Sequence, residues 1–392
     1  MMRHIRVPAK SVESTLEILK KFGWLNRRMR IISSEAENYR LIPLDSNAPI
    51  HLPPELSSFE IIEDEGLLEN RMNTDWLDYL LEQINESEFE EYRDYWPNSH
   101  EFIGDMMVVR IDEAISKFTE KIAIAKLKSH QHIRLILNDN GVKGEYRIRD
   151  LAPIGHRKGK NIHTKNLESK INTKVIVKES GQEIICDPTK AYFSTKLQTE
   201  RLETLSLAKE LKIILKRPIA ICDPFCGVGP ALAPLLREEN LVDSLLACDF
   251  NPNAVSFLFE NLTKWDKRKY PNFPKGISKV YQDRIIGHAD ATKLAQDPEL
   301  LGIWDLLILN IPHRALEFLP KLTPLLRKDS PTLIRGRIIV PESEILSTNK
   351  RLNKILPNKL DGYEKPSLKV KRDYSSSLRL CSFHAWLKIS NQ

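Results

Sequence analysis

The sequence predicts an α/β protein whose largest domain holds a doubly wound, mostly parallel sheet. Four short apolar runs in the second half of the chain each end in a polar side chain, as buried parallel strands do where they lead into a ligand crevice. A Gly-x-Gly turn follows the first run, and a segment with helical periodicity follows the second. We therefore expect several polar side chains to meet at one edge of a sheet.

The first run covers residues 218–222 and leads into Asp223, with glycines at 227 and 229. Glycines there let the backbone turn tightly and approach a ligand closely. The Asp before the glycines and the missing third Gly favour S-adenosylmethionine over a dinucleotide, because a sulfonium amino acid has no pyrophosphate to place at a helix N-terminus. The alternative is an ordinary strand-to-helix turn.

The next two runs end in carboxylates. Residues 245–249 end at Asp249, which would face the ribose hydroxyls, and residues 284–290 end at Asp290, which would accept from an adenine amino group. Any one of the three Asp residues could instead cap a helix. Their recurrence at three successive strand ends favours a ligand crevice.

The fourth run, residues 304–310, ends in Asn310-Ile311-Pro312-His313. An Asn-Pro-Pro-aromatic tetrapeptide at this place would indicate methylation of an exocyclic amine, which this sequence does not fit. No Pro-Cys follows the run, so a covalent cysteine mechanism on a pyrimidine carbon lacks its nucleophile. The pattern favours a ring nitrogen as the target.

Several blocks of this sequence resemble the tRNA guanine-37 N1-methyltransferases of archaea and eukaryotes, a family shared with the wybutosine-pathway transferases. The similar blocks are Asp-Pro-Phe-Cys-Gly-Val-Gly-Pro at 223–230, Asn-Ile-Pro-His-Arg-Ala-Leu-Glu-Phe-Leu at 310–319, Ala-Tyr-Phe-Ser-Thr-Lys-Leu-Gln-Thr-Glu-Arg at 191–201, Phe-Ile-Gly-Asp at 102–105 and Gly-Glu-Tyr-Arg at 144–147. Departures are Thr195 for the usual Pro, Ile311 for Leu, and Leu-Ile-Arg-Gly-Arg at 333–337, where many members carry a His and Tyr pair.

The resemblance implies a Rossmann-like class I methyltransferase domain with S-adenosylmethionine as cofactor and tRNA as partner. It implies transfer of a methyl group to N1 of guanosine 37, beside the anticodon. The residues expected to bind the cofactor are Asp223, Phe225, Gly227, Gly229, Asp249, Asp290 and Asn310.

Guanine N1 carries a proton that a base must remove, and the charge that moves onto O6 needs a donor. The resemblance assigns the base to Glu200 and the O6 donor to Arg147, with Asn310 holding the base edge. Tyr192, Pro312 and Arg201 are expected to contact the substrate base.

Two alternatives remain open for these roles. Glu200 could be an exposed helix residue paired with Arg201 or Lys196. Arg149 lies two residues from Arg147 and would share its face of a strand, so it is a second candidate for the O6 donor.

The charge of the chain favours a nucleic-acid partner. Its formal net charge is +6, but residues 57–97 hold 13 acidic side chains against two Arg, a balance of −11, which leaves +17 for the rest. The densest basic stretch is 156–160, followed by Lys165, Lys170 and Lys174; it is either an RNA-contacting loop or a solvated insertion.

Composition breaks divide the chain into four expected parts. They are a small N-terminal α/β domain that binds tRNA (1–56), an acidic linker with one helix (57–97), a middle α/β domain (98–186) and the methyltransferase domain (187–392). Expected helices cover 11–22, 75–84, 196–215 and 254–262, and expected strands include 29–33, 39–43 and a closing pair within 370–387.

The five cysteines form no Cys-x-x-Cys and lie in apolar runs, which predicts reduced thiols in a cytoplasmic protein. We expect no membrane span, no metal site and a monomer. Two other functions stay open: a wybutosine-pathway transferase that passes an aminocarboxypropyl group or a second methyl to a modified guanosine 37, and an RNA-binding protein with a degenerate donor pocket.

Overall fold

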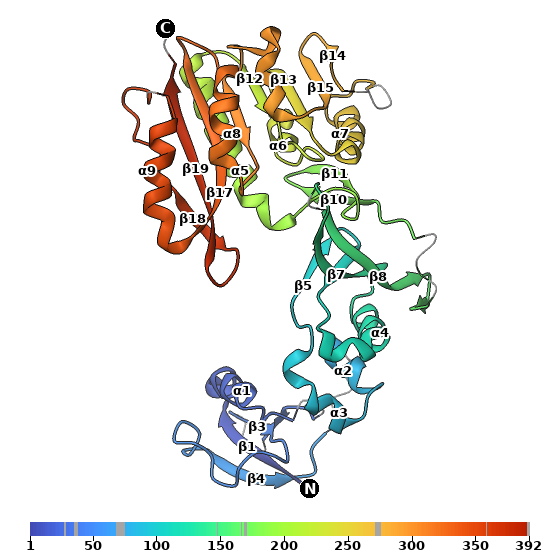
Figure 1. Ribbon diagram of the computed structural model, residues 1–392. Helices are drawn as coiled ribbons and strands as arrows, with labels where there is room; N and C mark the ends of the chain where they lie inside the picture. The colour runs from blue at the N-terminus through green and yellow to red at the C-terminus, as the bar shows by residue number, and fades with distance from the viewer. Residues whose placement is uncertain are drawn as a thin grey trace. The chain divides into compact units, whose positions relative to one another are not determined.

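The computed structural model describes residues 1–26, 29–34, 38–67, 75–146, 148–165, 167, 171–270, 276–357 and 359–389. The chain divides into two compact units, Met1–Asp78 and Tyr79–Gln392 (Figure 1). Each unit is described by itself.

The first unit is an antiparallel four-stranded sheet in the order β2-β3-β1-β4, with one α-helix. Its elements are β1 (Met2–Pro8), α1 (Val12–Lys21), β2 (Ile32–Ser33), β3 (Tyr39–Pro43) and β4 (Glu60–Asp64). Ile5, Leu19 and Ile42 are fully buried between helix and sheet. The sequence analysis did not predict β1 or β4. The acidic residues of β4 made this segment resemble a linker in the sequence, although charged residues are common on edge strands.

The acidic stretch contains more structure than the single helix expected from the sequence. Besides β4 it holds α2 (Trp76–Leu81), α3 (Glu86–Glu91) and the 3₁₀-helix η2 (Arg93–Tyr95). The aromatic side chains after α2 pack together: the Trp96 ring lies 5.7 Å from Phe89 and 5.4 Å from Phe118, and its indole N–H donates to the Phe89 carbonyl at 3.0 Å. These aromatic side chains therefore pack against neighbours within the protein.

The second unit begins with a five-stranded sheet in the order β5-β6-β7-β8-β9, covered by α4. The bounds are β5 (His100–Ile103), β6 (Met106–Val109), η3 (Glu113–Phe118), α4 (Thr119–Ser129), β7 (Leu135–Lys143), β8 (Ile148–Lys158) and β9 (Asn161–His163). The basic stretch 156–160 forms the end of β8 and the turn into β9, so it is a β-hairpin and not an open loop. A separate hairpin, β10 (Val175–Glu179) with β11 (Gln182–Cys186), comes next.

The rest of the second unit is built on an eight-stranded sheet in the order β14-β15-β13-β12-β16-β17-β19-β18. The five strands from β15 to β17 pair in parallel, and antiparallel strands close both edges. The bounds are β12 (Ile219–Asp223), β13 (Val242–Asp249), β14 (Ile277–Tyr281), β15 (Arg284–His288), β16 (Leu306–Leu309), β17 (Pro331–Pro341), β18 (Lys369–Asp373) and β19 (Leu378–Lys388). The predicted closing pair of strands is confirmed.

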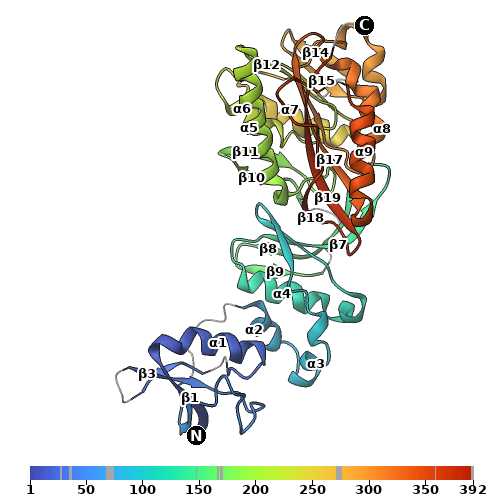
Figure 2. The same cartoon turned by 90° about the vertical axis from the view of Figure 1, so that its left-hand side faces the viewer.

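Helices cover both faces of this sheet, as Figure 2 shows for α5 and α6 on one side and α8 and α9 on the other. The bounds are η4 (Thr195–Leu197), α5 (Gln198–Leu215), α6 (Leu232–Arg237), α7 (Pro252–Trp265), η5 (Ala291–Gln296), η6 (Pro298–Leu300), α8 (Ala315–Leu322), η7 (Thr323–Leu325), η8 (Glu342–Glu344) and α9 (Ile345–Ile355). Every residue of β12 is buried, as expected for a strand covered on both faces. The doubly wound fold is therefore confirmed.

The chain runs from β12 outward to β13 and β15 and then returns to β16 on the other side of β12. In open α/β sheets ligands bind at such a switch point, outside the carboxyl ends of the strands. The fold thus directs attention to the segments after β12 and β16.

Candidate active site

The loop after β12 presents bare backbone to the switch point. Gly227 and Gly229 have φ angles of +56° and +87°, which side chains other than hydrogen rarely permit. A Cβ on Gly229 would come within 2.7 Å of Leu258 Cδ1, so packing against α7 excludes a side chain there. A Cβ on Gly227 would meet only the Tyr192 carbonyl oxygen, at 3.9 Å. Gly227 therefore leaves room for a ligand to approach the backbone.

Two carboxylates lie at the ends of the neighbouring strands β12 and β13, Asp223 buried and Asp249 partly buried. Asp249 accepts from the N–H groups of Gly227 and Asn251, both at 2.8 Å, and so fixes the glycine loop. Asp223 is 1% exposed and accepts from the Phe225 N–H at 3.3 Å. Burial raises the pKa of Asp249, and it raises the pKa of Asp223 to about 7. A cationic, hydroxyl-bearing ligand such as S-adenosylmethionine fits these carboxylates, because it would relieve the cost of burying them.

Asp290 follows β15 and caps η5. Its Oδ1 accepts from the Thr292 N–H at 2.9 Å and from the Thr292 hydroxyl at 2.8 Å. Partial burial raises its pKa, but the hydrogen bonds from Thr292 outweigh that effect and the pKa lies below its ordinary value. The helix cap expected as an alternative is present, so the position of Asp290 after β15 does not by itself indicate a ligand.

Glu200 lies in the first turn of α5, where it is 6% exposed. Its Oε2 accepts from the Nε–H of Arg337 on β17 at 2.6 Å. The alternative of an exposed Glu200 paired with Arg201 or Lys196 is therefore wrong. A carboxylate held by a guanidinium is oriented, as a general base must be.

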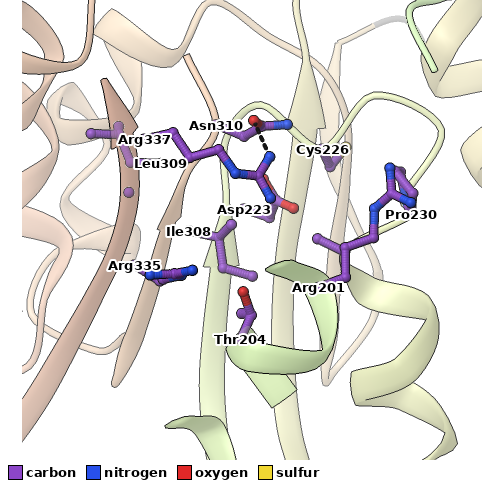
Figure 3. A pocket seen from close by; sticks show the side chains of 12 residues that line it. Arg201, Thr204, Asp223, Cys226, Pro230, Ile308, Leu309, Asn310, Arg335 and Arg337 are labelled. Atoms are coloured by element: carbon purple, nitrogen blue, oxygen red, sulfur yellow. Dashed lines mark hydrogen bonds between the residues drawn. The ribbon is translucent and has the colours of Figure 1, made fainter. Parts of the chain in front are cut away.

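Asn310 follows β16 and shares the same guanidinium. Its Oδ1 accepts from Nη1 of Arg337 at 2.8 Å, the contact drawn in Figure 3. Arg337 thus joins Glu200, which precedes it by 137 residues, to Asn310, which precedes it by 27 residues. The next motif residue, Pro312, accepts from the Ile339 N–H at 3.0 Å and ties this loop to β17 as well.

A second ion pair runs parallel to the first between α5 and β17. Arg335 donates to Glu203 at 2.7 Å, and Lys371 on β18 donates to the same carboxylate at 2.5 Å. Residues three apart share a helix face, and residues two apart share a strand face, so the two pairs form a ladder. The ladder fixes the first turns of α5 against the sheet and with them Glu200.

A cavity of about 30 Å³ lies between the two halves of the site, enough for one or two water molecules. Asp223 from the donor side and Asn310 and Arg337 from the other side line it, as Figure 3 shows. The structure therefore brings Asp223, predicted to bind the donor, and Asn310, predicted to hold the base, to one cavity.

Comparisons with known proteins show which families and structures this chain resembles. Two family models match, the "TYW2 N-terminal domain" at 78–155 and the "TRM5/TYW2 methyltransferase domain" at 175–271. The chain is 29% identical over 260 residues to the tRNA (guanine(37)-N(1))-methyltransferase Trm5b of Pyrococcus abyssi, a match that covers 66% of this chain and 67% of that protein. In these two segments the chain is similar to the TRM5/TYW2 methyltransferase family.

Other relatives are matched over less of their length. Two tRNA (guanine(37)-N(1))-methyltransferases of Phaeodactylum tricornutum are 30% and 26% identical over 42% and 63% of this chain, which is 25% and 52% of those proteins. Among solved structures, P. abyssi Trm5b has a TM-score of 0.61 at 23% identity over 99% of this chain and all of that one. P. horikoshii TYW2, solved in complex with MeSAdo, has a TM-score of 0.54 at 16% identity over 80% of this chain and 98% of that one. These two likenesses show a shared fold.

Three further predicted residues have defined surroundings. Tyr192 is half exposed, and Phe225 packs edge-on against Phe318 with ring centroids 5.1 Å apart. Arg201 is buried, pairs with Glu179 at 2.5 Å and donates to the Ser194 carbonyl at 2.8 Å. Its guanidinium is thus held by the protein, although it lines the cavity.

Arg147 lies outside the described residues. The second candidate, Arg149, donates to Glu101 and Asp139, both at 2.8 Å, so its guanidinium is committed to an ion-pair network in the middle sheet. Tyr146 contacts Phe250, with ring centroids 5.7 Å apart, and Phe250 directly follows Asp249. The chain just before Arg147 therefore reaches the end of β13, on the donor side.

Sequence reasoning missed Arg337, noting residues 333–337 only as a departure from the family pattern. Two arginines at alternate positions of an apolar strand were the available signal, because they share one face. Their partners on α5 were not visible from the sequence, since no local spacing links a strand to a helix more than a hundred residues away.

The described residues offer little support for a cysteine nucleophile or a metal site. All five cysteines are free and buried, and burial raises the pKa of the Cys226 thiol well above its ordinary value, which disfavours a thiolate nucleophile in the glycine loop. Within the described ranges, no group of three or more His, Cys, Asp or Glu side chains could hold a metal ion. In the same part of the chain, no helix is both long and apolar enough to span a membrane.

Proposed function

We propose that this protein transfers the methyl group of S-adenosylmethionine to N1 of guanosine 37 in tRNA. The observation that carries the proposal is Arg337, which holds the buried Glu200 together with Asn310 and lines a small cavity with Asn310 and Asp223. The 29% identity to P. abyssi Trm5b supports the same reaction.

The cofactor supplies an electrophilic methyl group when it is bound. In this proposal Asp223, Asp249, Asp290 and the backbone of the glycine loop hold it, and Gly227 leaves room for close approach. Phe225 adds an apolar wall. Because both Asp223 and Asp249 lie at strand ends of the parallel sheet, the donor is placed at the switch point.

Glu200 acts on the acceptor. Guanine N1 is a poor nucleophile while it is protonated, so Glu200 removes that proton as the N1–methyl bond forms. Asn310 and Pro312 hold the edge of the base, and Tyr192, which is half exposed, frames the entrance. Arg147 is the O6 donor that the family resemblance implies. Guanosine 37 is stacked between its neighbours in the tRNA, so it must leave that stack to enter the site.

We assign tRNA binding to the N-terminal and middle domains, with the target base held by the methyltransferase domain. The small domain at 1–56 and the middle domain at 98–186 would grip the folded tRNA, and the domain at 187–392 would hold the base. The charge of +17 outside residues 57–97 favours a polyanionic partner. A homologue, aTrm5, has been solved in complex with tRNALeu, which supports the choice of partner.

A second candidate is a TYW2-type transfer of the aminocarboxypropyl group to a carbon of a modified guanosine 37. The match of residues 78–155 to the TYW2 N-terminal domain favours it. A transfer to carbon has no guanine N1 proton to remove, so a buried carboxylate base speaks for N1 methylation.

The test is incubation of the full chain with methyl-labelled S-adenosylmethionine and two tRNA transcripts that differ only by guanosine or adenosine at position 37. Nucleoside mass spectrometry then identifies the product. The proposal expects 1-methylguanosine from the guanosine transcript alone. No methylation of either transcript, with the donor still bound in a titration, would favour a wybutosine-type substrate, whereas no donor binding would leave only an RNA-binding protein.

A further inference from the structure

Arg337 is built into the acceptor side of the site in a way that neither the motif analysis nor the family resemblance assigns. Its side chain is 12% exposed and lies on β17, between α5 and the loop after β16. Nε bonds to Glu200 at 2.6 Å and Nη1 bonds to Asn310 at 2.8 Å. Within the described residues Nη2 makes no hydrogen bond, so the guanidinium keeps donor capacity for a ligand.

The order of these groups matches the edge of guanine. A carboxylate beside a guanidinium presents an acceptor next to a donor. Guanine presents the complementary pair, the N1–H donor next to the O6 acceptor. Adenine presents an N1 acceptor next to an N6 donor, so both contacts would be repulsive. The pair of Glu200 and Arg337 therefore complements the hydrogen-bonding edge of guanine and not that of adenine.

The ladder between α5 and β17 keeps this pair rigid. Arg335 holds Glu203 one helical turn beyond Glu200, and Lys371 holds it from β18. Rigidity matters because a donor aimed at developing charge stabilises it best when it does not have to reorganise. O6 gains negative charge as N1 loses its proton, and a carbonyl oxygen can accept from two donors.

From this geometry we propose that Arg337 donates to O6 of the target guanine and sets the specificity of the site for guanine over adenine. The inference rests on the proposed methylation of guanine N1. It adds a base-reading residue from β17 to the one that the resemblance implies at position 147.

The test replaces O6 of guanosine 37 by sulfur in a ligated tRNA, because sulfur is the weaker hydrogen-bond acceptor. Single-turnover methylation is measured for the wild type, Arg337→Gln, Arg337→Lys and the control Arg335→Gln. Arg335 is matched to Arg337: it lies on the same face of the same strand and pairs with a glutamate of the same helix. The effect of sulfur on N1 acidity is common to all four proteins and cancels in the comparison.

We expect Arg337→Gln to lose about 100-fold in rate on the normal tRNA. We expect sulfur to slow the wild type and Arg335→Gln by about tenfold, and Arg337→Gln by less than about twofold. Arg337→Lys keeps the charge but loses the planar guanidinium with its several N–H donors. Its sulfur effect should lie between those of the wild type and Arg337→Gln. If Arg337→Gln does not fold, as thermal unfolding and donor binding would report, Arg337→Lys carries the comparison with the wild type.

An equal sulfur effect in the wild type and in the folded Arg337 variant would overturn the role of Arg337 and leave the proposed function intact. Absence of 1-methylguanosine with the wild type and normal tRNA would overturn both. The two failures are therefore distinguishable.

Discussion

The donor side and the acceptor side of this site are held by different kinds of contact. On the donor side, Asp249 and Asp290 accept hydrogen bonds from nearby backbone N–H groups. The glycine loop there depends on the positive φ angles of Gly227 and Gly229. On the acceptor side, Glu200 and Asn310 depend on the side chain of Arg337. Backbone contacts depend on the conformation of the loop, whereas side-chain contacts depend on one residue, so the two sides should respond differently to substitution.

The largest effect is expected from the acceptor side. Glu200→Gln keeps the shape of the side chain but removes the base, so we expect kcat/KM for guanosine 37 to fall by about 1,000-fold. Glu203→Gln is the matched control, because it lies one turn further along α5 and breaks the same kind of ion pair. It should cost less than about tenfold. Comparable losses in the two variants would reduce Glu200 to a structural member of the ladder.

On the donor side, the largest effect should come from Gly229→Ala. The new Cβ meets Leu258 Cδ1 at 2.7 Å in a left-handed backbone conformation, so we expect a loss of about 3 kcal/mol in the free energy of unfolding. Gly302→Ala is the control: its φ is +70°, and a Cβ there meets nothing within 4 Å. It should cost about 1 kcal/mol, the backbone strain alone. Urea unfolding measures the free energy of unfolding of both variants. Equal losses would show that Leu258 and the glycine loop shift to accommodate the new Cβ without further cost.

How far each side could be predicted follows from the same difference. β12, the glycine turn and the carboxylates at 223 and 249 were predicted because a buried strand and its terminal residue are adjacent in sequence. Glu200 and Asn310 were named through the resemblance. Arg337, which joins them, was missed because its contacts are purely tertiary.

The errors in the fold have similar causes. β1 was missed although its pairing with β3 makes it central to the first sheet, and β4 was read as part of a linker because Glu60, Glu63 and Asp64 obscure an edge strand. The basic stretch after 156 was read as a loop because its charges gave no sign of the pairing between β8 and β9. Composition alone does not distinguish an exposed strand from a loop.

A smaller effect is expected from pH. The pKa of Asp223 is raised to about 7, so its carboxyl is mostly protonated at pH 6 and mostly ionised at pH 8. The cationic donor binds the ionised form, and its affinity should therefore rise by about tenfold from pH 6 to pH 8. The raised value also means that this group makes the folded state less stable as pH rises from about 4 to 7.

Calorimetric titration with S-adenosylmethionine measures this dependence, and Asp223→Asn is its control. The variant should show a flat profile over the same range, apart from titration of the ligand itself. A wild-type affinity that follows the profile of the variant would exclude Asp223 as the charged group that meets the donor.

The most direct measurement compares Glu200→Gln with Asp249→Asn, using the donor dissociation constant and the single-turnover rate of 1-methylguanosine formation at saturating donor. If the two sides act separately, Glu200→Gln keeps the dissociation constant within about twofold and loses about 1,000-fold in rate. Asp249→Asn then raises the dissociation constant by about tenfold or more and keeps most of the rate. Parallel losses of affinity and rate in both variants would contradict the division of the site into a donor side and an acceptor side.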